Sequence, residues 1–192
     1  MTRLLADIRS RRYFWGMLIF EPHSVPSLGV ENLPDPSAFT VFTPFIKGVF
    51  SQWHHTPFCL EGINFVTAEQ WMMYCKAMLF GDKAAANKII ATEDPATQKR
   101  LGQTVTSFEQ GAWDHWKIDV VYRGNIAKFA QNDGALRQLR NTAETLLVEA
   151  NPRDWVWGSG LAIENPAGHS PAMWRGQNLL GLILTKVRDD LA

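Results

Sequence analysis

Helix start and stop signals in the middle of the chain constrain its fold more than any other sequence feature. The segment TAEQ at 67–70 has the pattern of a capping box, in which the Thr side chain caps the helix and the Gln side chain reciprocates. Apolar residues then recur every three or four positions, and Gly81 supplies a stop signal. We therefore expect an amphipathic helix over residues 68–80.

Other segments carry comparable helix signals. Asp94 followed by Pro95 is typical of a helix start. Ser107, followed three positions later by Gln110, forms a second capping-box pattern. A KAAA segment and apolar residues at helical spacing mark the remaining helices. Together these signals predict helices over residues 82–91, 95–102, 107–129, 135–141 and 178–191.

Strand signals are few and short. The segment FCLEGINF at 58–65 predicts a tight antiparallel hairpin whose turn uses Gly62, because glycine tolerates positive φ. An apolar run at 146–150 predicts one more strand. The sequence therefore predicts a mainly α fold with a small antiparallel β-sheet (α+β). We expect one domain over residues 39–192, after an irregular N-terminal extension at 1–38. Residues 21–48 are rich in Pro, Ser and Gly and are expected to be irregular chain laid over a core.

The charge balance excludes some classes of function. The chain has 19 Lys and Arg residues and 19 Asp and Glu residues, so its net charge is zero and no general electrostatic attraction to nucleic acid or membrane is expected. No apolar run reaches the roughly 20 residues that span a bilayer. Cys59 and Cys75 match neither a disulfide scaffold nor a zinc motif. We expect a cytoplasmic protein with reduced thiols, no metal and no cofactor.

Eight tryptophans are more than a core of this size requires. Trp71 and Trp116 lie on apolar helix faces and are expected in the core. Three others lie in polar or glycine-rich segments and are expected to anchor loops near a site. These three are Trp53, Trp155 and Trp174.

Two segments have the residue types of a functional site. Glu69 and Lys76 are seven residues apart, so on a helix they share one face, separated by roughly 10 Å along the axis. They either converge on a small ligand or are ordinary surface residues. The segment WVWGSG at 155–160 lacks the spacing of a nucleophile elbow, and no Asp–His order completes a serine triad. It predicts a loop that approaches a ligand closely, or one that its indoles hold to the core.

Two polar residues could bind an anion. Asn178 opens the last predicted helix, whose N–H groups form a potential phosphate site, although a simple cap is more common. Arg123 lies on the long predicted helix, where it either binds a ligand or faces solvent.

Taken in order, these segments resemble the NADAR family, also called YbiA-like. The resemblance runs from about residue 39 to residue 191 and implies an activity on N-glycosidic bonds to ribose. The matching segments are SQW at 51–53, TAEQWMMYCK at 67–76, RGNIAKF at 123–129, LVEA at 147–150, WGSGL at 157–161 and WRGQNLLG at 174–181.

The resemblance implies roles for individual residues. Glu69 falls on the acidic residue of the family and Lys76 on its lysine, so both are predicted to be catalytic. Trp113 and Trp157 fall on its two functional indoles. Substrate binding is predicted for Trp53, Trp113, Arg123, Trp157, Gly158, Ser159, Glu164 and Asn178.

Two positions depart from the family pattern. Shorter members carry Asp where this chain has Ser159, and Glu164 is the residue that could supply the missing carboxylate. Gln70 replaces a histidine, so any role that needs an imidazole is lost.

Three functions remain open from sequence alone. The first is hydrolysis of the phosphorylated ribosylamino-pyrimidine intermediates of riboflavin synthesis. The second is removal of ADP-ribose from guanine in nucleic acid, and the third is non-catalytic sensing of ADP-ribose or a related nucleotide. The expected partner is a small phosphorylated ribosyl or ADP-ribosyl compound, with nucleic acid only as a modified substrate and no membrane; oligomeric state is not predicted. Zero net charge favours the first function.

Overall fold

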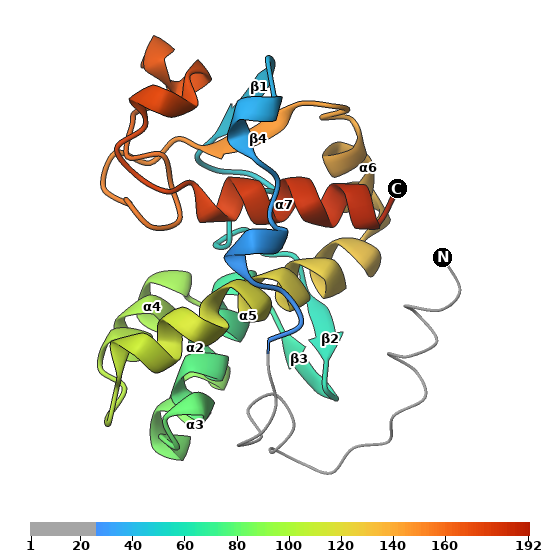
Figure 1. Ribbon diagram of the computed structural model, residues 1–192. Coiled ribbons are helices and arrows are strands. Elements are labelled where there is room, and N and C mark those ends of the chain that lie inside the picture. Colours follow the sequence, from blue (N-terminus) through green and yellow to red (C-terminus); the bar gives the residue numbers. More distant parts are fainter. Residues whose placement is uncertain (1–25) are drawn as a thin grey trace.

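The computed structural model describes residues 26–192, and helices dominate it as predicted (Figure 1). Each predicted helix is present within two residues of its expected ends, except at the start of the longest one. The elements, with η for a 3-10 helix, are η1 (Val30–Asn32), η2 (Pro36–Ala38), β1 (Phe42–Phe45), β2 (Phe58–Leu60), β3 (Ile63–Phe65), α2 (Ala68–Leu79), α3 (Lys83–Ile90), α4 (Pro95–Gln103), α5 (Gln110–Ala130), α6 (Asp133–Arg140), β4 (Leu146–Glu149), η3 (Pro166–His169), η4 (Pro171–Met173) and α7 (Leu179–Asp190).

Helix α2 begins as the capping pattern predicts, but its Gln has a different partner. Oγ1 of Thr67 accepts from the N–H of Gln70 at 3.0 Å. The Gln70 side chain accepts from the N–H of Val66 instead of Thr67 and donates to the carbonyls of Ile89 and Thr92. Gln70 is therefore a buried structural residue that ties the start of α2 to the end of α3.

Helix α5 begins later than predicted. Ser107 adopts a left-handed conformation, with φ of 57°, so it cannot be the cap. The cap is Glu109, whose carboxylate accepts from the N–H groups of Gly111 and Ala112 at 2.8 and 2.5 Å. The predicted capping box at Ser107 was wrong because a glutamate two positions later offers two acceptor oxygens to the same free N–H groups.

The strands form two separate pairs. β2 and β3 form the predicted antiparallel hairpin, with positive φ at both Glu61 and Gly62. β1 lies in a segment predicted to be irregular, and it pairs with β4 in parallel, placing Phe45 opposite Glu149. The prediction of an antiparallel sheet therefore holds for the hairpin only. A parallel pair needs a long crossover, here provided by the intervening helices, and such a crossover leaves no local turn signal in the sequence.

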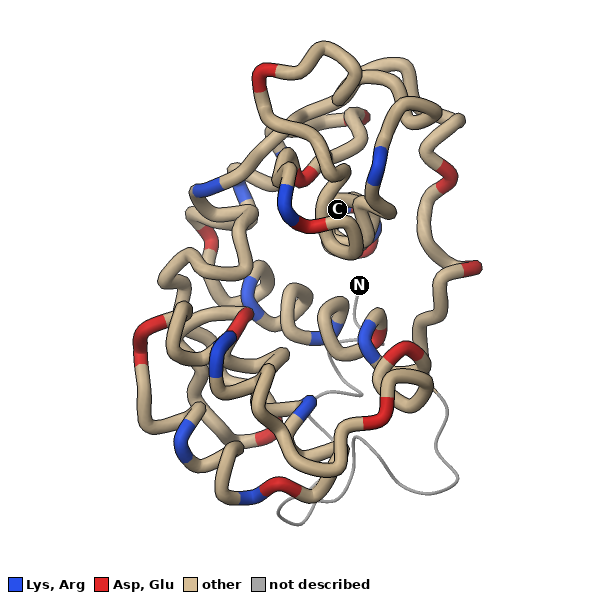
Figure 2. The backbone as a smooth tube through the Cα atoms, turned by 90° about the vertical axis from the view of Figure 1, so that its left-hand side faces the viewer, with Lys and Arg blue, Asp and Glu red and all other residues tan. Residues whose placement is uncertain are grey.

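Helix α5 crosses the middle of the molecule (Figure 1). Helices α2, α3 and α4 pack together on one side, and α7 with the β1–β4 pair lies on the other (Figure 1). Helix α5 contacts both α2 and α7, and its residues Val120 and Phe129 are fully buried. Lys and Arg residues are interspersed with Asp and Glu residues along the described chain (Figure 2).

The described part of the predicted N-terminal extension is held against the helices. Leu28 is buried in the core, and the N–H of Ser27 donates to Oδ1 of Asp119 on α5 at 3.1 Å. Residues 1–25 of that extension lie outside the described residues. Cys59 and Cys75 are both unpaired. Among the helices of residues 26–192, none is long and apolar enough to cross a membrane.

Candidate active site

Glu69 occupies the first turn of α2, with 3% of its surface exposed. Its N–H donates to the carbonyl of Gln52 at 3.0 Å, which fixes the helix start against the turn at 51–53. Its Oε1 has no hydrogen-bond partner among residues 26–192. Burial raises the pKa of Glu69 to about 7, although the charge of Lys99 and a hydrogen bond from Trp53 act to lower it. Such a carboxyl group is suited to acid–base catalysis at neutral pH.

Lys76 lies two turns further along α2, and its surroundings are aromatic. Its Nζ is 4.2 Å from the ring centroid of Phe108 and 5.9 Å from that of Trp113, which is buried. Burial lowers the pKa of Lys76, and the charge of Glu69 partly opposes this effect. The predicted Glu69–Lys76 pair is therefore electrostatically linked, and Trp113 lies beside it.

Glu149, at the end of β4, is a second acid of this site, and sequence reasoning gave it no role. Its Oε2 is buried and has no hydrogen-bond partner in the part of the chain that the structure describes. Burial raises the pKa of Glu149 to about 7; the charges of Asp154 and Glu69 raise it further, whereas Lys99 lowers it. The signal that could have revealed this residue is an acid closing a strand that is otherwise apolar and fully buried.

The loop after β4 carries the predicted indoles. Oδ1 of Asp154 accepts from the N–H groups of Val156 and Trp157 at 3.0 and 2.8 Å, which fixes the loop. Trp157 is half-buried against the core, whereas Trp155 is 58% exposed. Trp157 therefore anchors the loop to the core while part of its ring stays accessible, and Trp155 is exposed to solvent.

Gly158 and Ser159 support Glu149. A Cβ atom on Gly158 would lie 3.0 Å from the carbonyl oxygen of Glu149, so any larger residue would crowd that carbonyl. Ser159 is fully buried, and its N–H and Oγ both donate to that same carbonyl, at 2.9 and 3.2 Å. The two residues were predicted to bind substrate, but in the structure both contact the strand that carries Glu149.

The structure does not support an anion site at the start of α7. Asn178 is fully buried, and its side chain accepts from the N–H of Glu149 at 2.9 Å and donates to the carbonyl of Leu147 at 3.0 Å. The N–H groups of residues 177–180 donate to the carbonyls of residues 155–158. The prediction fails because these N–H groups already donate to carbonyls of the loop and are not free to bind an anion.

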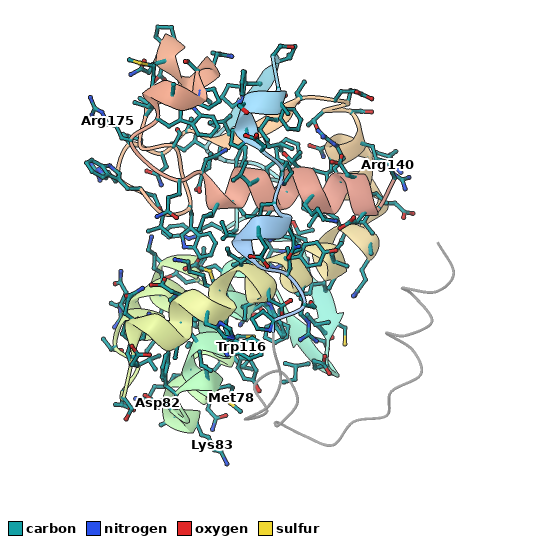
Figure 3. All side chains as sticks on the ribbon, viewed as in Figure 1. Met78, Asp82, Lys83, Trp116, Arg140 and Arg175 are labelled. Atoms are coloured by element: carbon teal, nitrogen blue, oxygen red, sulfur yellow. The ribbon has the colours of Figure 1, made fainter. Side chains whose placement is uncertain are left out.

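Two other predicted binding residues lie apart from the acids. Arg123 pairs with Glu61 of the hairpin turn at 2.8 Å and is not among the charges that shift the pKa of Glu69 or Glu149. Glu164 is exposed and is not among the charges that shift the pKa of Glu69 or Glu149, whereas Asp154 shifts both. Arg175, in the segment before α7, points outward at the edge of the molecule (Figure 3).

Trp53 lies next to Glu69, to which its side chain donates a hydrogen bond. Its ring is 44% exposed, and Nζ of Lys99 is 5.9 Å from the ring centroid. Lys99 is therefore the lysine that the structure places near Trp53 and, by its effect on their pKa values, near Glu69 and Glu149.

Comparisons with known proteins show the family of this chain. A model of the NADAR domain matches residues 39–192. The chain belongs to the NADAR family. It is 40% identical over 147 residues to an N-glycosidase of Acanthamoeba polyphaga mimivirus, a match that covers 74% of this chain and 86% of the relative. It is also 31% identical over 118 residues to a riboflavin biosynthesis protein of Vibrio vulnificus, covering 62% of this chain and 29% of that protein.

The N-glycosidase YbiA of Escherichia coli is similar in both sequence and structure. The chain is 29% identical to it over 145 residues, covering 76% of this chain and 82% of YbiA. The NMR structure of E. coli YbiA superposes with a TM-score of 0.66 at 25% identity, covering 80% of this chain and 86% of that one. The NADAR fold expected from the sequence is therefore confirmed.

This NADAR domain also contains a buried lysine that sequence reasoning missed. Lys128 on α5 is fully buried, and its Nζ donates to the carbonyl of Ser51 at 3.0 Å. Burial lowers the pKa of Lys128 to about 7. The lysine thereby holds the turn at 51–53, which in turn contacts Glu69. The sequence signal is a cation inside the otherwise packed end of a long helix.

Proposed function

We propose that this protein is an N-glycosidase that hydrolyses the N-ribosyl bond of a small phosphorylated substrate. The observation that carries the proposal is a pair of carboxyl groups, one on the buried Glu69 and one on the half-buried Glu149. Each has one buried oxygen without a partner among the described residues and a pKa of about 7. Glycoside hydrolysis typically uses two carboxyl groups of this kind. The mimivirus relative and YbiA, both named N-glycosidases, support the same reaction class.

The two acids would have different roles in the reaction. Cleavage of the bond from the anomeric carbon to nitrogen develops positive charge on the sugar, and the leaving nitrogen needs a proton. In the proposed reaction, ionised Glu69 stabilises the sugar cation and protonated Glu149 donates its proton to the leaving nitrogen. Water then attacks the anomeric carbon and returns a proton to Glu149.

Lys76 is proposed as a participant in the same reaction. Its lowered pKa increases the share of neutral amine, which is the nucleophilic form. The amine would attack the anomeric carbon as the base departs and then lose a proton. The sugar ring of the adduct would open to a Schiff base, and water would hydrolyse the Schiff base and restore the amine. In the simpler alternative, Lys76 stays protonated and only neutralises negative charge on the substrate.

We favour the ribosylamino-pyrimidine phosphates of early riboflavin synthesis as substrates. The similarity to the riboflavin biosynthesis protein of Vibrio vulnificus supports this choice, as does the mixture of Lys and Arg with Asp and Glu along the described chain (Figure 2). Lys99, which acts on both acids, is the proposed partner of the phosphate group in place of Asn178 and Arg123. A cytoplasmic location remains part of the proposal.

One observation favours ADP-ribosylated guanine as an alternative substrate. Trp53 and Trp155 are 44% and 58% exposed near the acids, and exposed indoles can stack on nucleobases that flank a modified guanine.

The deciding experiment compares the two substrates. Purified protein is incubated separately with the ribosylamino-pyrimidine phosphate and with an ADP-ribosylated guanine oligonucleotide, and released ribose phosphate and ADP-ribose are measured. Release from the first alone is expected, and the Glu69→Gln variant should release neither product. Release from the oligonucleotide alone would favour the alternative, and binding of either compound without release would favour a non-catalytic sensor.

A further inference from the structure

Three buried polar atoms, on neighbouring residues from three different segments, have no hydrogen-bond partner in the described part of the chain. Within residues 26–192, hydrogen-bond partners are lacking for Nε2 of Gln52, Oδ1 of Asn125 and Oε1 of Glu69. Each of these residues is more than nine-tenths buried. They are neighbours because the carbonyl of Gln52 accepts from the N–H of Glu69 at 3.0 Å, and Oε1 of Gln52 accepts from Nδ2 of Asn125 at 3.0 Å.

The side-chain amides of Gln52 and Asn125 form one hydrogen bond with each other, and each keeps one polar atom without a partner among the described residues. Nδ2 of Asn125 also donates to the carbonyl of Val121 at 2.8 Å, which fixes the orientation of its side chain on α5. The turn that carries Gln52 is held by the bond from Lys128 to the carbonyl of Ser51. Because an unpaired buried polar atom destabilises a fold, a rigid arrangement that leaves three of them together points to a ligand.

The unpaired atoms define what that ligand must offer. Nε2 of Gln52 is a donor, whereas Oδ1 of Asn125 and Oε1 of Glu69 are acceptors. A phosphate group offers only acceptors and would be repelled by ionised Glu69. Two neighbouring hydroxyl groups offer two donors and several lone pairs, which matches the one donor and two acceptors. The proposed function places the sugar at Glu69, so the ring hydroxyls of a ribosyl group would lie next to the reacting carbon.

We propose that Gln52 and Asn125 form a subsite for the vicinal hydroxyl groups of the ribosyl substrate, with Glu69 accepting from one of them. This inference rests on the proposed N-ribosyl hydrolysis and adds selection of the sugar to it. A substrate that lacks the 2-hydroxyl leaves buried polar atoms unpaired, and sites of this kind reject such analogues strongly. The subsite therefore makes the enzyme selective for ribosyl over 2-deoxyribosyl substrates.

The first test measures that selectivity with the full chain. We compare kcat/KM for a ribosylamino-pyrimidine phosphate and for its 2-deoxyribosyl counterpart, and expect the wild-type protein to favour the ribosyl compound at least about 100-fold. Gln52→Met, of similar size but without the amide, should lower this ratio at least tenfold. Gln52→Glu keeps the acceptor that Asn125 needs, exchanges the unpaired donor for a carboxylate oxygen, and should lower the ratio as well. The matched control is Gln131→Met, which removes an amide that bonds only the hairpin strand at Cys59, and its ratio should stay at the wild-type value.

Two results would overturn the subsite. One is a wild-type enzyme that treats both sugars equally, and the other is a Gln52→Met variant that loses the same factor on both substrates, as a purely structural role predicts. If the wild-type protein releases sugar from neither compound, the proposed function fails. The subsite is then tested by calorimetric titration with ribose 5-phosphate and 2-deoxyribose 5-phosphate. Tighter binding of ribose 5-phosphate that Gln52→Met abolishes supports the subsite, and equal or absent binding of the two sugars overturns it.

Discussion

Glu69 and Glu149 come from a helix and a strand far apart in the chain, yet the charge of Glu69 raises the pKa of Glu149, and burial brings both near 7. Each keeps one oxygen unpaired within the described part of the chain. When one of two coupled acids has lost its proton, the other holds its proton more tightly. With both pKa values near 7, molecules that have one ionised and one protonated carboxyl group are present at neutral pH, and this is the combination that the proposed hydrolysis needs.

Replacing Glu149 by Gln should lower kcat about 100-fold or more, because a positioned general acid contributes about 10²–10⁴ to the rate. The amide keeps the shape of the side chain but cannot donate an acidic proton. Steady-state kinetics across pH 5–9 would show a bell-shaped profile for the wild-type protein and the loss of its alkaline limb in the variant. Glu144→Gln, at an exposed position, serves as the control. A Glu149→Gln variant with wild-type kcat would leave Glu149 with a structural role only.

Stability should pass through a minimum near pH 7. Burial raises the pKa of Glu69 and Glu149 from 4.5 to about 7, so the folded protein retains protons that the unfolded chain has released between these pH values. The unfolding free energy therefore falls as pH rises through this window, by up to about 3 kcal/mol for each acid. Burial lowers the pKa of Lys128 from 10.5 to about 7, so the unfolding free energy rises again between pH 7 and 10.5.

Denaturant unfolding at pH 5, 7 and 9 tests these signs. Glu149→Gln should flatten the acid side of the curve, and Lys128→Met should flatten the alkaline side, because each variant removes one of the shifted groups. An unfolding free energy that rises from pH 5 to pH 7 in the wild-type protein would contradict the assignment for the two acids.

The parts of this fold that were predictable from sequence depend on neighbours along the chain. The Thr67 cap and the shared face of Glu69 and Lys76 follow from helical periodicity, which acts over a few residues. The parallel pairing that places Phe45 opposite Glu149 depends on segments about a hundred residues apart, and no local signal specifies it.

The roles of single polar residues were harder to predict for the same reason. Asn178 has the appearance of a helix cap, but its amide bonds β4 and its neighbouring N–H groups bond the loop at 155–158. Arg123 matches a family segment, but Glu61 of the hairpin pairs with it. In both cases the partner comes from a distant segment, so only the folded structure shows that the side chain already has a bonding partner.

Borohydride reduction should trap a covalent adduct on Lys76 if its amine attacks the sugar. Mass spectrometry of the reduced protein is expected to show one added sugar phosphate, located on the peptide that contains Lys76. Lys76→Met should give no adduct and should lose turnover. Lys83→Met is the matched control, because Lys83 is exposed at the start of α3 and points outward at the edge of the molecule (Figure 3). An active wild-type enzyme that yields no adduct would leave Lys76 with a purely electrostatic role.

Gly124→Ala should destabilise the protein through Trp71. A Cβ atom at position 124 would lie 2.3 Å from Cδ1 and 2.8 Å from Nε1 of the Trp71 ring, which is buried and donates to the carbonyl of Val120 at 2.7 Å. The ring cannot retreat without losing that bond, so we expect a loss of about 1–3 kcal/mol in unfolding free energy, typical of overpacking.

Gly134→Ala is the matched control. A Cβ atom there meets only Nη2 of Arg137 at 3.9 Å, so the helix propensity of alanine should stabilise α6 slightly. Chemical denaturation of both variants measures the difference in unfolding free energy. Equal stability of the two variants would contradict the prediction, because it would show that α2 and α5 can move apart without loss of unfolding free energy.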